Sequence, residues 1–258
     1  MVRKERSAES GSAGSSAGRS LRLLAWLAEA GHAQSLADLA SALDLPKPTA
    51  HRLCAQLMET GFIARDVKDR EFVVGPSLRK LALDALNHGT TRGLRHEVLA
   101  DLVAQVGETC NFTTLDGAQV LYLDRVEPPW PWRLTLDLGA HVPLHCTASG
   151  KLFLALMQPA RREALLAQLT LQPLTENTLT TTAALRAEWD AIAAGAYALD
   201  REEFITGLVA IAVPVRDEHG ELRAALAMHA PLTRISLQDA VARLPALQAA
   251  ALRMGRLL

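Results

Sequence analysis

The chain has few cysteines, and none is spaced for a disulfide framework or a zinc ribbon. Cys54, Cys110 and Cys146 are odd in number and form no CxxC pair. No apolar run approaches the roughly 18 to 20 residues that span a membrane, and residues 1–10 are charged and polar, without the apolar stretch of a signal peptide. We therefore expect a cytoplasmic protein that does not associate with membranes.

The chain also lacks a net charge of either sign that would indicate its partners. Residues 1–90 contain 12 basic and 10 acidic residues (+2), and the rest contains 15 and 18 (−3), which gives −1 in total. This balance neither indicates nor excludes nucleic-acid binding, because it can hide a local basic face. A content of 49% hydrophobic residues excludes disorder as the main state, and a length of 258 residues favours two domains.

The N-terminal segment is poor in residues that can form a core. Residues 7–18 read SAESGSAGSSAG, and such a composition buries too little apolar surface to offset chain entropy. We therefore expect residues 1–18 to be a disordered tail. Ser20 is a suitable N-cap for a first helix that ends at Gly31.

The next segment has helix caps and helix breaks in the order that is typical of a winged helix-turn-helix. Ser35 can cap a short helix, Asp44-Leu45-Pro46 interrupts it, and a second helix follows from about Pro48 to Gly61. Residues 62–76 then place apolar runs on both sides of a polar turn, which predicts a hairpin in the position of a wing. Residues 19–76 are predicted to form this domain, and 77–93 a linker helix.

The remainder, residues 94–258, mixes helical and strand patterns. Tight turns at Asp116-Gly117 and His219-Gly220 indicate antiparallel hairpins. The expected strands are 111–115, 119–126, 132–136, 208–215 and 222–229. The expected helices are 94–106, 147–156, 159–168, 182–194 and one from about 236. The fold class is α+β: the winged domain is followed by an α/β domain with an antiparallel sheet.

The second helix of the helix-turn-helix begins with residues suited to reading DNA. The N-terminal residues of a helix in the major groove meet base edges, and here these residues are Lys47, Thr49, His51 and Arg52. From the wing, Arg65 and Arg70 are candidates for phosphate contacts. The alternatives are a solvated helical hairpin, which the following wing disfavours, and a mixed hairpin tip whose basic residues alternate with acidic ones.

Two segments of the second domain are candidate ligand sites. In HCTASGK, Thr147 can cap a helix and leave the N–H groups of Ala148, Ser149 and Gly150 available to a carboxylate. The alternative is that the small residues only allow close helix packing. Asp200 precedes a strongly apolar strand. Its side chain either faces a pocket at the entrance of that strand or belongs to a solvent-exposed surface loop.

Cys146 follows two histidines in sequence, His141 and His145, which raises the question of a catalytic or metal-binding role. His145 and Cys146 are adjacent in a strand-like segment and so point to opposite faces, and His141 stands further away. Nucleophilic catalysis by Cys and His also needs an orienting partner that the sequence does not show. We therefore expect no catalytic residue, no metal and no cofactor.

Several separate motifs resemble the IclR-type transcriptional regulators over nearly the whole chain. The matching stretches occur in the family's order and spacing: SLADLASALDLPKPTAHRL with a wing ending in VVG, GETCNFTTLDGAQVLYLDRVE, VPLHCTASGKLFLA, ALDREEFITGLVAIAVPV and AMHAPLTR. The resemblance implies a winged helix domain, a linker helix that takes part in dimerisation and a GAF-like effector domain. Members form homodimers and homotetramers, and they repress or activate catabolic genes in response to small organic or aromatic acids.

The resemblance also implies which residues meet the effector. The family pattern carries over to Leu134, Ala148, Ser149, Asp200, Ala210, Ala227 and His229, and the free N–H groups at the helix start add Gly150 to the candidate effector residues. Members that bind very small acids have Cys or Ser at positions 210, 227 and 229, so the alanines predict a roomier pocket and His229 adds a donor or a positive group.

The leading interpretation is a regulator that binds a double-stranded DNA operator and responds to a small acid. Two alternatives stay open: an enzyme on a GAF-like domain that uses Cys146, and a DNA-binding protein whose C-terminal domain only oligomerises. The effector, the operator, the sign of regulation and the choice between dimer and tetramer do not follow from the sequence.

Overall fold

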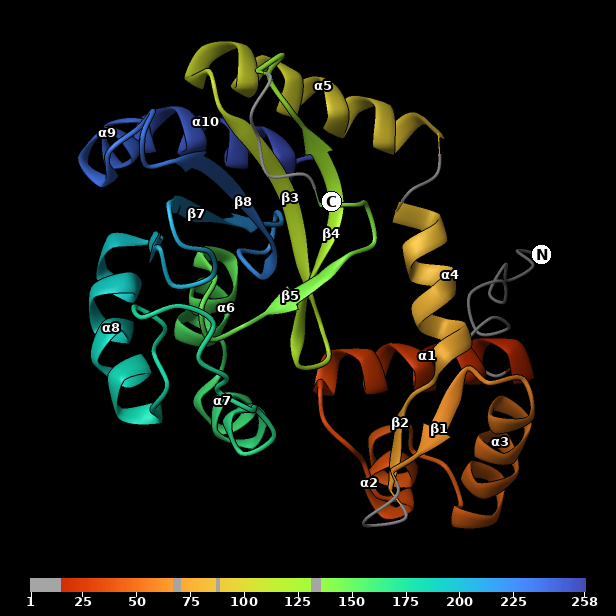
Figure 1. The fold of residues 1–258 in the computed structure, drawn as a ribbon. Coiled ribbons are helices and arrows are strands. Elements are labelled where there is room, and N and C mark those ends of the chain that lie inside the picture. The colour runs from red at the N-terminus through yellow and green to blue at the C-terminus, as the bar shows by residue number, and fades with distance from the viewer. Residues whose placement is uncertain (1–14, 67–70, 87–88, 131–135) are drawn as a thin grey trace, which may run out of the picture. The chain divides into compact units, whose positions relative to one another are not determined.

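The structure is a computed structural model that describes residues 15–66, 71–86, 89–130 and 136–258. The chain divides into two compact units, Met1–Leu86 and Asn87–Leu258 (Figure 1). The segment expected as one linker helix is thus divided, because α4 (Pro76–Leu86) belongs to the N-terminal unit and α5 (Gly89–Val106) to the C-terminal unit. No helix in the described ranges is long and apolar enough to cross a membrane.

The N-terminal unit consists of three helices, a two-stranded hairpin and α4. The elements are α1 (Ser16–Ala30), α2 (Leu36–Ala42), α3 (Lys47–Glu59), β1 (Ile63–Arg65) and β2 (Phe72–Val74). Apolar residues at helical spacing on α1, α2 and α3 meet the hairpin in one core: Leu23, Leu27, Leu39, Leu53, Leu57, Ile63 and Phe72. This is the expected winged helix-turn-helix.

Two predicted helix starts are wrong. Helix α1 begins at Ser16 rather than after Ser20, because Ser15 is the N-cap and its side chain accepts a hydrogen bond from the Gly18 N–H. Residues 16–18 are therefore helical, and residues 1–14 of the expected tail lie outside the described residues. Similarly, α5 begins at Gly89 rather than at residue 94, since a glycine costs a helix only about 1 kcal/mol.

The C-terminal unit is built on a six-stranded antiparallel sheet with the strand order β5-β4-β3-β8-β7-β6. The strands are β3 (Thr109–Asp116), β4 (Gln119–Val126), β5 (His141–Pro143), β6 (Ala198–Arg201), β7 (Leu208–Arg216) and β8 (Leu222–Pro231). The predicted hairpins β3–β4 and β7–β8 are present. The short strands β5 and β6 were not predicted, because three or four residues carry no readable alternation. Most of the expected strand 132–136 lies outside the described residues.

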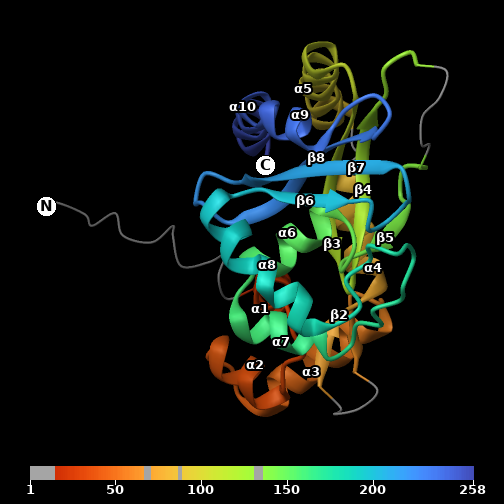
Figure 2. The same cartoon turned by 60° about the vertical axis from the view of Figure 1, so that its left-hand side comes forward.

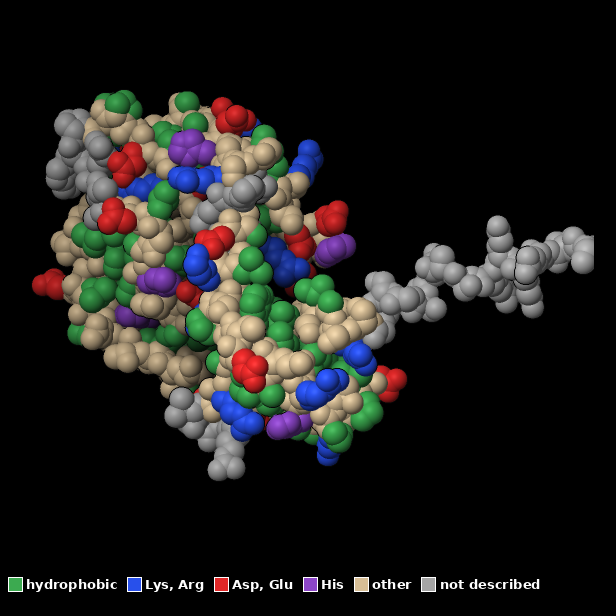
Figure 3. All heavy atoms as spheres, turned by 90° about the vertical axis from the view of Figure 1, so that its right-hand side faces the viewer, with side chains coloured by type: hydrophobic (Ala, Val, Ile, Leu, Met, Phe, Trp, Pro, Cys, Tyr) green, Lys and Arg blue, Asp and Glu red, His purple; other side chains and the backbone are tan. Residues whose placement is uncertain are grey.

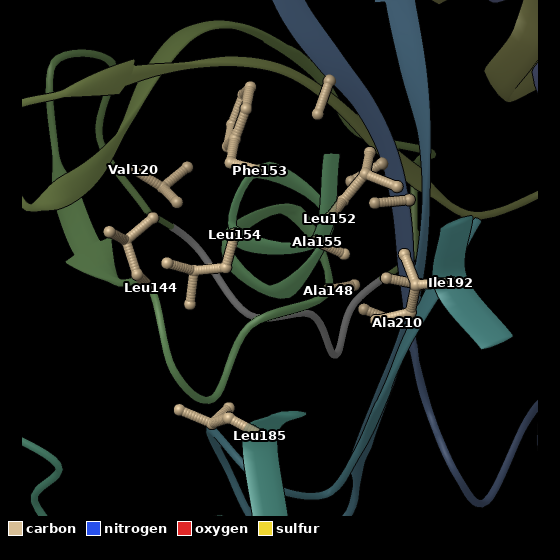
Figure 4. Close-up of a cluster of buried hydrophobic side chains, with 14 of the residues drawn as sticks. Val120, Leu144, Ala148, Leu152, Phe153, Leu154, Ala155, Leu185, Ile192 and Ala210 are labelled. Carbon is tan, nitrogen blue, oxygen red and sulfur yellow. The ribbon is translucent and has the colours of Figure 1, made fainter. Parts of the chain in front are cut away.

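Helices cover both faces of this sheet. Helices α5 and α10 (Leu244–Gly255) pack on one face, and α6 (Ala148–Leu156) packs on the other with α8 (Thr182–Gly195) beside it (Figures 1 and 2). The remaining helices are α7 (Pro159–Leu166) and α9 (Leu237–Ala242), so the predicted terminal helix is two helices. Figure 4 shows the core around α6, which includes Val120, Leu144, Leu152, Leu154, Leu185 and Ile192.

Candidate functional site

Helix α3 presents the predicted DNA-reading residues on its exposed face. Ala50, Leu53, Cys54 and Leu57 are buried in the core, whereas Lys47, His51 and Arg52 are exposed and Thr49 is half-buried. The two sets lie on opposite sides of the helix because 3.6 residues complete a turn. The helix is therefore fixed by its apolar side while its polar side is open to a partner.

The turn before α3 is a tight one. Asp44 has φ of 51°, a left-handed conformation that Asp tolerates better than most residues. The Leu45 N–H donates to the Ala40 carbonyl, and Pro46 is the N-cap of α3, where it has no N–H to satisfy. This local chemistry sets the angle between α2 and α3 that defines a helix-turn-helix.

The wing is anchored to the rest of the N-terminal unit. Strands β1 and β2 are antiparallel, and Gln34 exchanges two backbone hydrogen bonds with Phe72 (2.9 and 2.8 Å). The exposed guanidinium of Arg65 lies 5.2 Å from the centre of the Phe72 ring, which supports it at the base of the wing. Arg70, the other predicted wing residue, lies outside the described residues.

Basic side chains at the start of α3 and on the wing are exposed: Lys47, Arg52 and Arg65. Figure 3 shows Lys, Arg and His side chains at the surface of this unit, with Asp and Glu side chains among them. Such a face suits the phosphate backbone of DNA, and the side chains at the start of α3 suit base edges. The individual contacts of Lys47, Thr49, His51, Arg52 and Arg65 remain predictions.

The C-terminal unit has a pocket between the start of α6 and one face of the sheet. Most of the predicted effector residues line it: Ala148, Ser149, Asp200, Ala210, Ala227 and His229. The sequence did not identify its other lining residues, which are Asn111, Tyr122, Val142, Thr147, Phe204 and Leu208. Leu134 lies outside the described residues. The volume open to the centre of a water molecule is about 20 Å³, room for roughly one water.

Strand pairing explains why residues so far apart in sequence meet here. Asp200 on β6 pairs with Ala210 on β7, which pairs with His229 on β8. In the adjacent row, Ala227 pairs with Asn111 on β3. Residues directly opposite one another point to the same face of a sheet, so both rows face α6. The alanines leave space between the polar groups at either end.

The start of α6 is capped as expected, but Gly150 has a different role from the predicted one. Thr147 Oγ1 accepts a hydrogen bond from the Gly150 N–H (3.2 Å), so this N–H is already used. A Cβ at position 150 would lie 2.2 Å from the Leu144 carbonyl oxygen. Gly150 therefore serves close packing, the alternative left open above, and it does not line the pocket. The first N–H groups of a helix have no partner within it, which leaves those of Ala148 and Ser149.

Asp200 is a buried acid with an altered titration. Its Oδ1 accepts hydrogen bonds from the backbone N–H groups of Glu203 (2.7 Å) and Phe204 (3.4 Å). Burial raises the pKa of its carboxyl to about 7, and these hydrogen bonds offset only part of that effect. Near neutral pH this side chain can therefore both accept and donate hydrogen bonds to a ligand.

A buried ion pair connects the elements that carry the pocket residues. Lys151, one residue beyond Gly150 on α6, is buried and bonds to Glu203 and to Glu188 (2.7 Å). Arg201 extends this cluster to the surface through Glu188 (2.6 Å). Burial raises the pKa of Glu203, and the neighbouring ammonium opposes that shift. The cluster ties α6, α8 and the end of β6 together around the pocket.

A second polar network, which the sequence analysis did not predict, lies at the β8 end of the pocket. The Asn111 amide contacts His229 Nδ1 (3.0 Å), and Arg125 on β4 donates to Asn111 Oδ1 (3.1 Å). Arg125 also donates to Glu127 (2.7 Å). The signal in the sequence was a polar Asn in the buried part of β3, but its contact with His229, 118 residues away, was not predictable from spacing.

The structure gives Cys146 no nucleophilic character. The residue is buried, and this burial raises the pKa of its thiol to about 12, so the thiolate is scarce at neutral pH. The neighbouring His145 directs its Nε2 to the Gln172 carbonyl oxygen (3.0 Å) instead. In the described parts of the chain, no three His, Cys, Asp or Glu residues are grouped as metal ligands would be.

The comparisons with known proteins agree with this architecture. The IclR helix-turn-helix domain matches residues 16–67, and the bacterial transcriptional regulator IclR C-terminal domain matches residues 84–256. The chain is 39% identical over 233 residues to the "Probable transcriptional regulator SauR" of Cupriavidus necator, covering 90% of this chain and 92% of that protein. It is 29% identical over 220 residues to the transcriptional repressor IclR of Escherichia coli, covering 84% and 80%.

A solved structure shows the same fold. The IclR homologue of Microbacterium hydrocarbonoxydans, crystallised with 4-hydroxybenzoate, superposes with a TM-score of 0.57 at 25% identity, covering 93% of this chain and 98% of that one. The matched families and relatives are transcriptional regulators and not enzymes. The chain therefore belongs to the IclR family of DNA-binding transcriptional regulators, with a helix-turn-helix domain and a C-terminal ligand-binding domain.

Proposed function

We propose that this regulator controls catabolic genes in response to a small organic or aromatic acid bound in the pocket at the start of α6. The proposal includes a pseudo-palindromic double-stranded operator and a homodimer or homotetramer in the cytoplasm. The observation that carries it is the convergence of Ala148, Ser149, Asp200 and His229 on one pocket whose remaining lining is mostly apolar.

The start of α6 is suited to a carboxylate. The N–H groups of Ala148 and Ser149 lie at the positive end of the helix dipole, and an anion there satisfies both. The Ser149 hydroxyl lies 3.1 Å from the Thr113 hydroxyl, whose single proton also has the Ala225 carbonyl oxygen as an acceptor (3.3 Å), so Ser149 is held in a buried hydroxyl pair. A carboxylate at this end leaves the rest of the ligand facing the alanines.

The remainder of the pocket favours an acid with a second oxygen. Asp200 and His229 stand in one row across the sheet, with Ala210 between them. The homologue from M. hydrocarbonoxydans was crystallised with an acid of this kind, 4-hydroxybenzoate. Because the pocket holds only about one water, a ring of that size requires a lining side chain to move, and the half-buried Phe204 is the expected one.

DNA recognition is assigned to α3 and the wing. Lys47, Thr49, His51 and Arg52 are proposed to meet base edges, with Arg65 and Arg70 on phosphates. One winged domain buries too little surface to select a single genomic site, so two domains on two half-sites are expected. Scrambling either half-site should therefore weaken binding.

Calorimetry of the full chain against a panel of organic and aromatic acids tests the ligand assignment. We expect at least one acid to bind, with a stoichiometry of one molecule per chain. Ala227→Leu, which fills the pocket, should abolish that binding, whereas Ala187→Leu, the same change on the exposed side of α8, should leave it intact. Absence of binding by every acid would favour a domain that only oligomerises, and undiminished binding by Ala227→Leu would place the ligand elsewhere.

A further inference from the structure

We infer that Asn111 and Arg125 are positioning residues that hold His229 as a neutral imidazole with its proton on Nε2, so that the ring offers a hydrogen-bond donor at the β8 end of the pocket. The consequence for the ligand rests on the proposed function, whereas the state of the ring does not. Neither Asn111 nor Arg125 was among the residues that the sequence identified.

The direction of the hydrogen bonds follows from Arg125. A guanidinium only donates, so the Asn111 atom that lies 3.1 Å from Arg125 Nη1 must be the amide oxygen. The NH₂ group of the same amide then faces His229 Nδ1 at 3.0 Å. An NH₂ group only donates, so Nδ1 must accept and carries no proton. A neutral imidazole with an unprotonated Nδ1 has its proton on Nε2.

The amide is held in this orientation from both sides. Arg125 and Asn111 are directly opposite one another on β4 and β3, and the Arg125 side chain is only 5% exposed. Glu127 accepts from Arg125 Nε at 2.7 Å and fixes the plane of the guanidinium. Flipping the Asn111 amide would set its NH₂ against the guanidinium and its oxygen against Nδ1, so two favourable contacts would be lost together.

The charges around the pocket also act on the ring. Arg125 from β4 reaches it through Asn111 and is paired with Glu127. The other buried cation, Lys151 on α6, is paired with Glu203, and Asp200 stands across Ala210 in the same row as His229. A second proton on His229 would point an N–H at the NH₂ of Asn111, which the hydrogen-bond geometry opposes directly.

The inference narrows the ligand class. His229 lines the pocket, and where its Nε2 meets a ligand it does so as a donor, so the matching ligand group is an acceptor oxygen. The first turn of α6 also presents donors. An acid that carries a carbonyl or hydroxyl oxygen at its other end satisfies both, whereas an ammonium group beside His229 is excluded.

Nitrogen NMR of the full chain labelled with ¹⁵N-histidine tests the state of the ring without any ligand. In the wild type near pH 7, we expect His229 to show a protonated, pyrrole-like Nε2 and an unprotonated, pyridine-like Nδ1. The signals are assigned by their loss in His229→Gln. His145, whose Nε2 donates to the Gln172 carbonyl, is an internal reference with the same tautomer.

Two variants of the positioning residues complete the test. Asn111→Asp replaces the NH₂ with an acceptor of equal size, so Nδ1 should become protonated while the His145 signals stay unchanged. Arg125→Gln frees the amide to flip, so both tautomers should appear. A protonated Nδ1 in the wild type, or an unchanged His229 in a folded Asn111→Asp variant, would overturn the inference. Failure of every acid to bind would instead contradict the proposed function and leave this result standing.

Discussion

Replacing Gly150 with alanine tests how closely α6 approaches the segment before it. The added Cβ would lie 2.2 Å from the oxygen and 2.4 Å from the Cα of Leu144, and backbone atoms cannot rotate away as a side chain does. In an open helix the same change stabilises by roughly 0.5 to 1 kcal/mol. Here we expect the overpacking to dominate and the C-terminal unit to lose roughly 1 to 3 kcal/mol of stability.

Gly93→Ala is the matched control. Gly93 also lies inside a helix, α5, but a Cβ there meets nothing within 4 Å. For a unit of this size, 1 kcal/mol corresponds to about 2 to 4 °C in Tm. Gly150→Ala should therefore lower the Tm of the C-terminal unit by about 2 to 12 °C, whereas Gly93→Ala should raise it slightly.

The assay is thermal unfolding followed by tryptophan fluorescence in a Trp26→Phe background. With Trp26 removed from the N-terminal unit, every remaining tryptophan belongs to the C-terminal unit. A Gly150→Ala variant as stable as Gly93→Ala would refute the close approach, and with it the conclusion that Gly150 packs α6.

Three further predictions concern the polar groups and the DNA-binding face. The folded-state pKa of Asp200 is raised, so the folded chain binds more protons than the unfolded chain between about pH 4 and pH 7; stability falls as pH rises through that window. Asp200→Asn should remove up to about 1.4 kcal/mol of this loss per pH unit in urea titrations. Lys151→Met leaves Glu203 buried without its partner and should destabilise by roughly 3 to 5 kcal/mol in the same assay, and a neutral result would contradict the ion-pair assignment. Arg52→Ala should cost specific DNA binding roughly 1 to 3 kcal/mol, whereas Arg65→Ala should weaken all sequences alike and lower the salt slope by about one; the reverse pattern would exchange their roles.

The elements with strong local signals were predictable. The helix caps at Ser35 and Thr147 and the glycine turns of the two hairpins are local chemistry, and the structure has them where the sequence placed them. The start of α1 was misplaced because Ser15 and Ser20 are equally good caps, and only the first is used. The Gly-containing start of α5 was misplaced because packing along the helix outweighs the low propensity of glycine.

The pocket was predictable only in part. Residues that the family resemblance pointed to, such as Asp200 and His229, do come together. Asn111 and Arg125 were missed because both act on His229, which is 118 residues from Asn111 in sequence, and no local pattern records that contact. Gly150 was assigned to the ligand because a helix start of small residues looks the same whether it binds an anion or packs closely.

The most direct test of the account is the affinity of the full chain for its own operator, located by footprinting and measured by fluorescence anisotropy with and without an acid that binds the pocket. We expect saturating acid to change the operator Kd by roughly 5- to 150-fold in the wild type. Ala227→Leu should bind the operator normally and show no response to the acid. If the acid does not change the operator Kd of the wild type, or changes the Kd of Ala227→Leu by the same factor, the claim that this pocket controls DNA binding is contradicted.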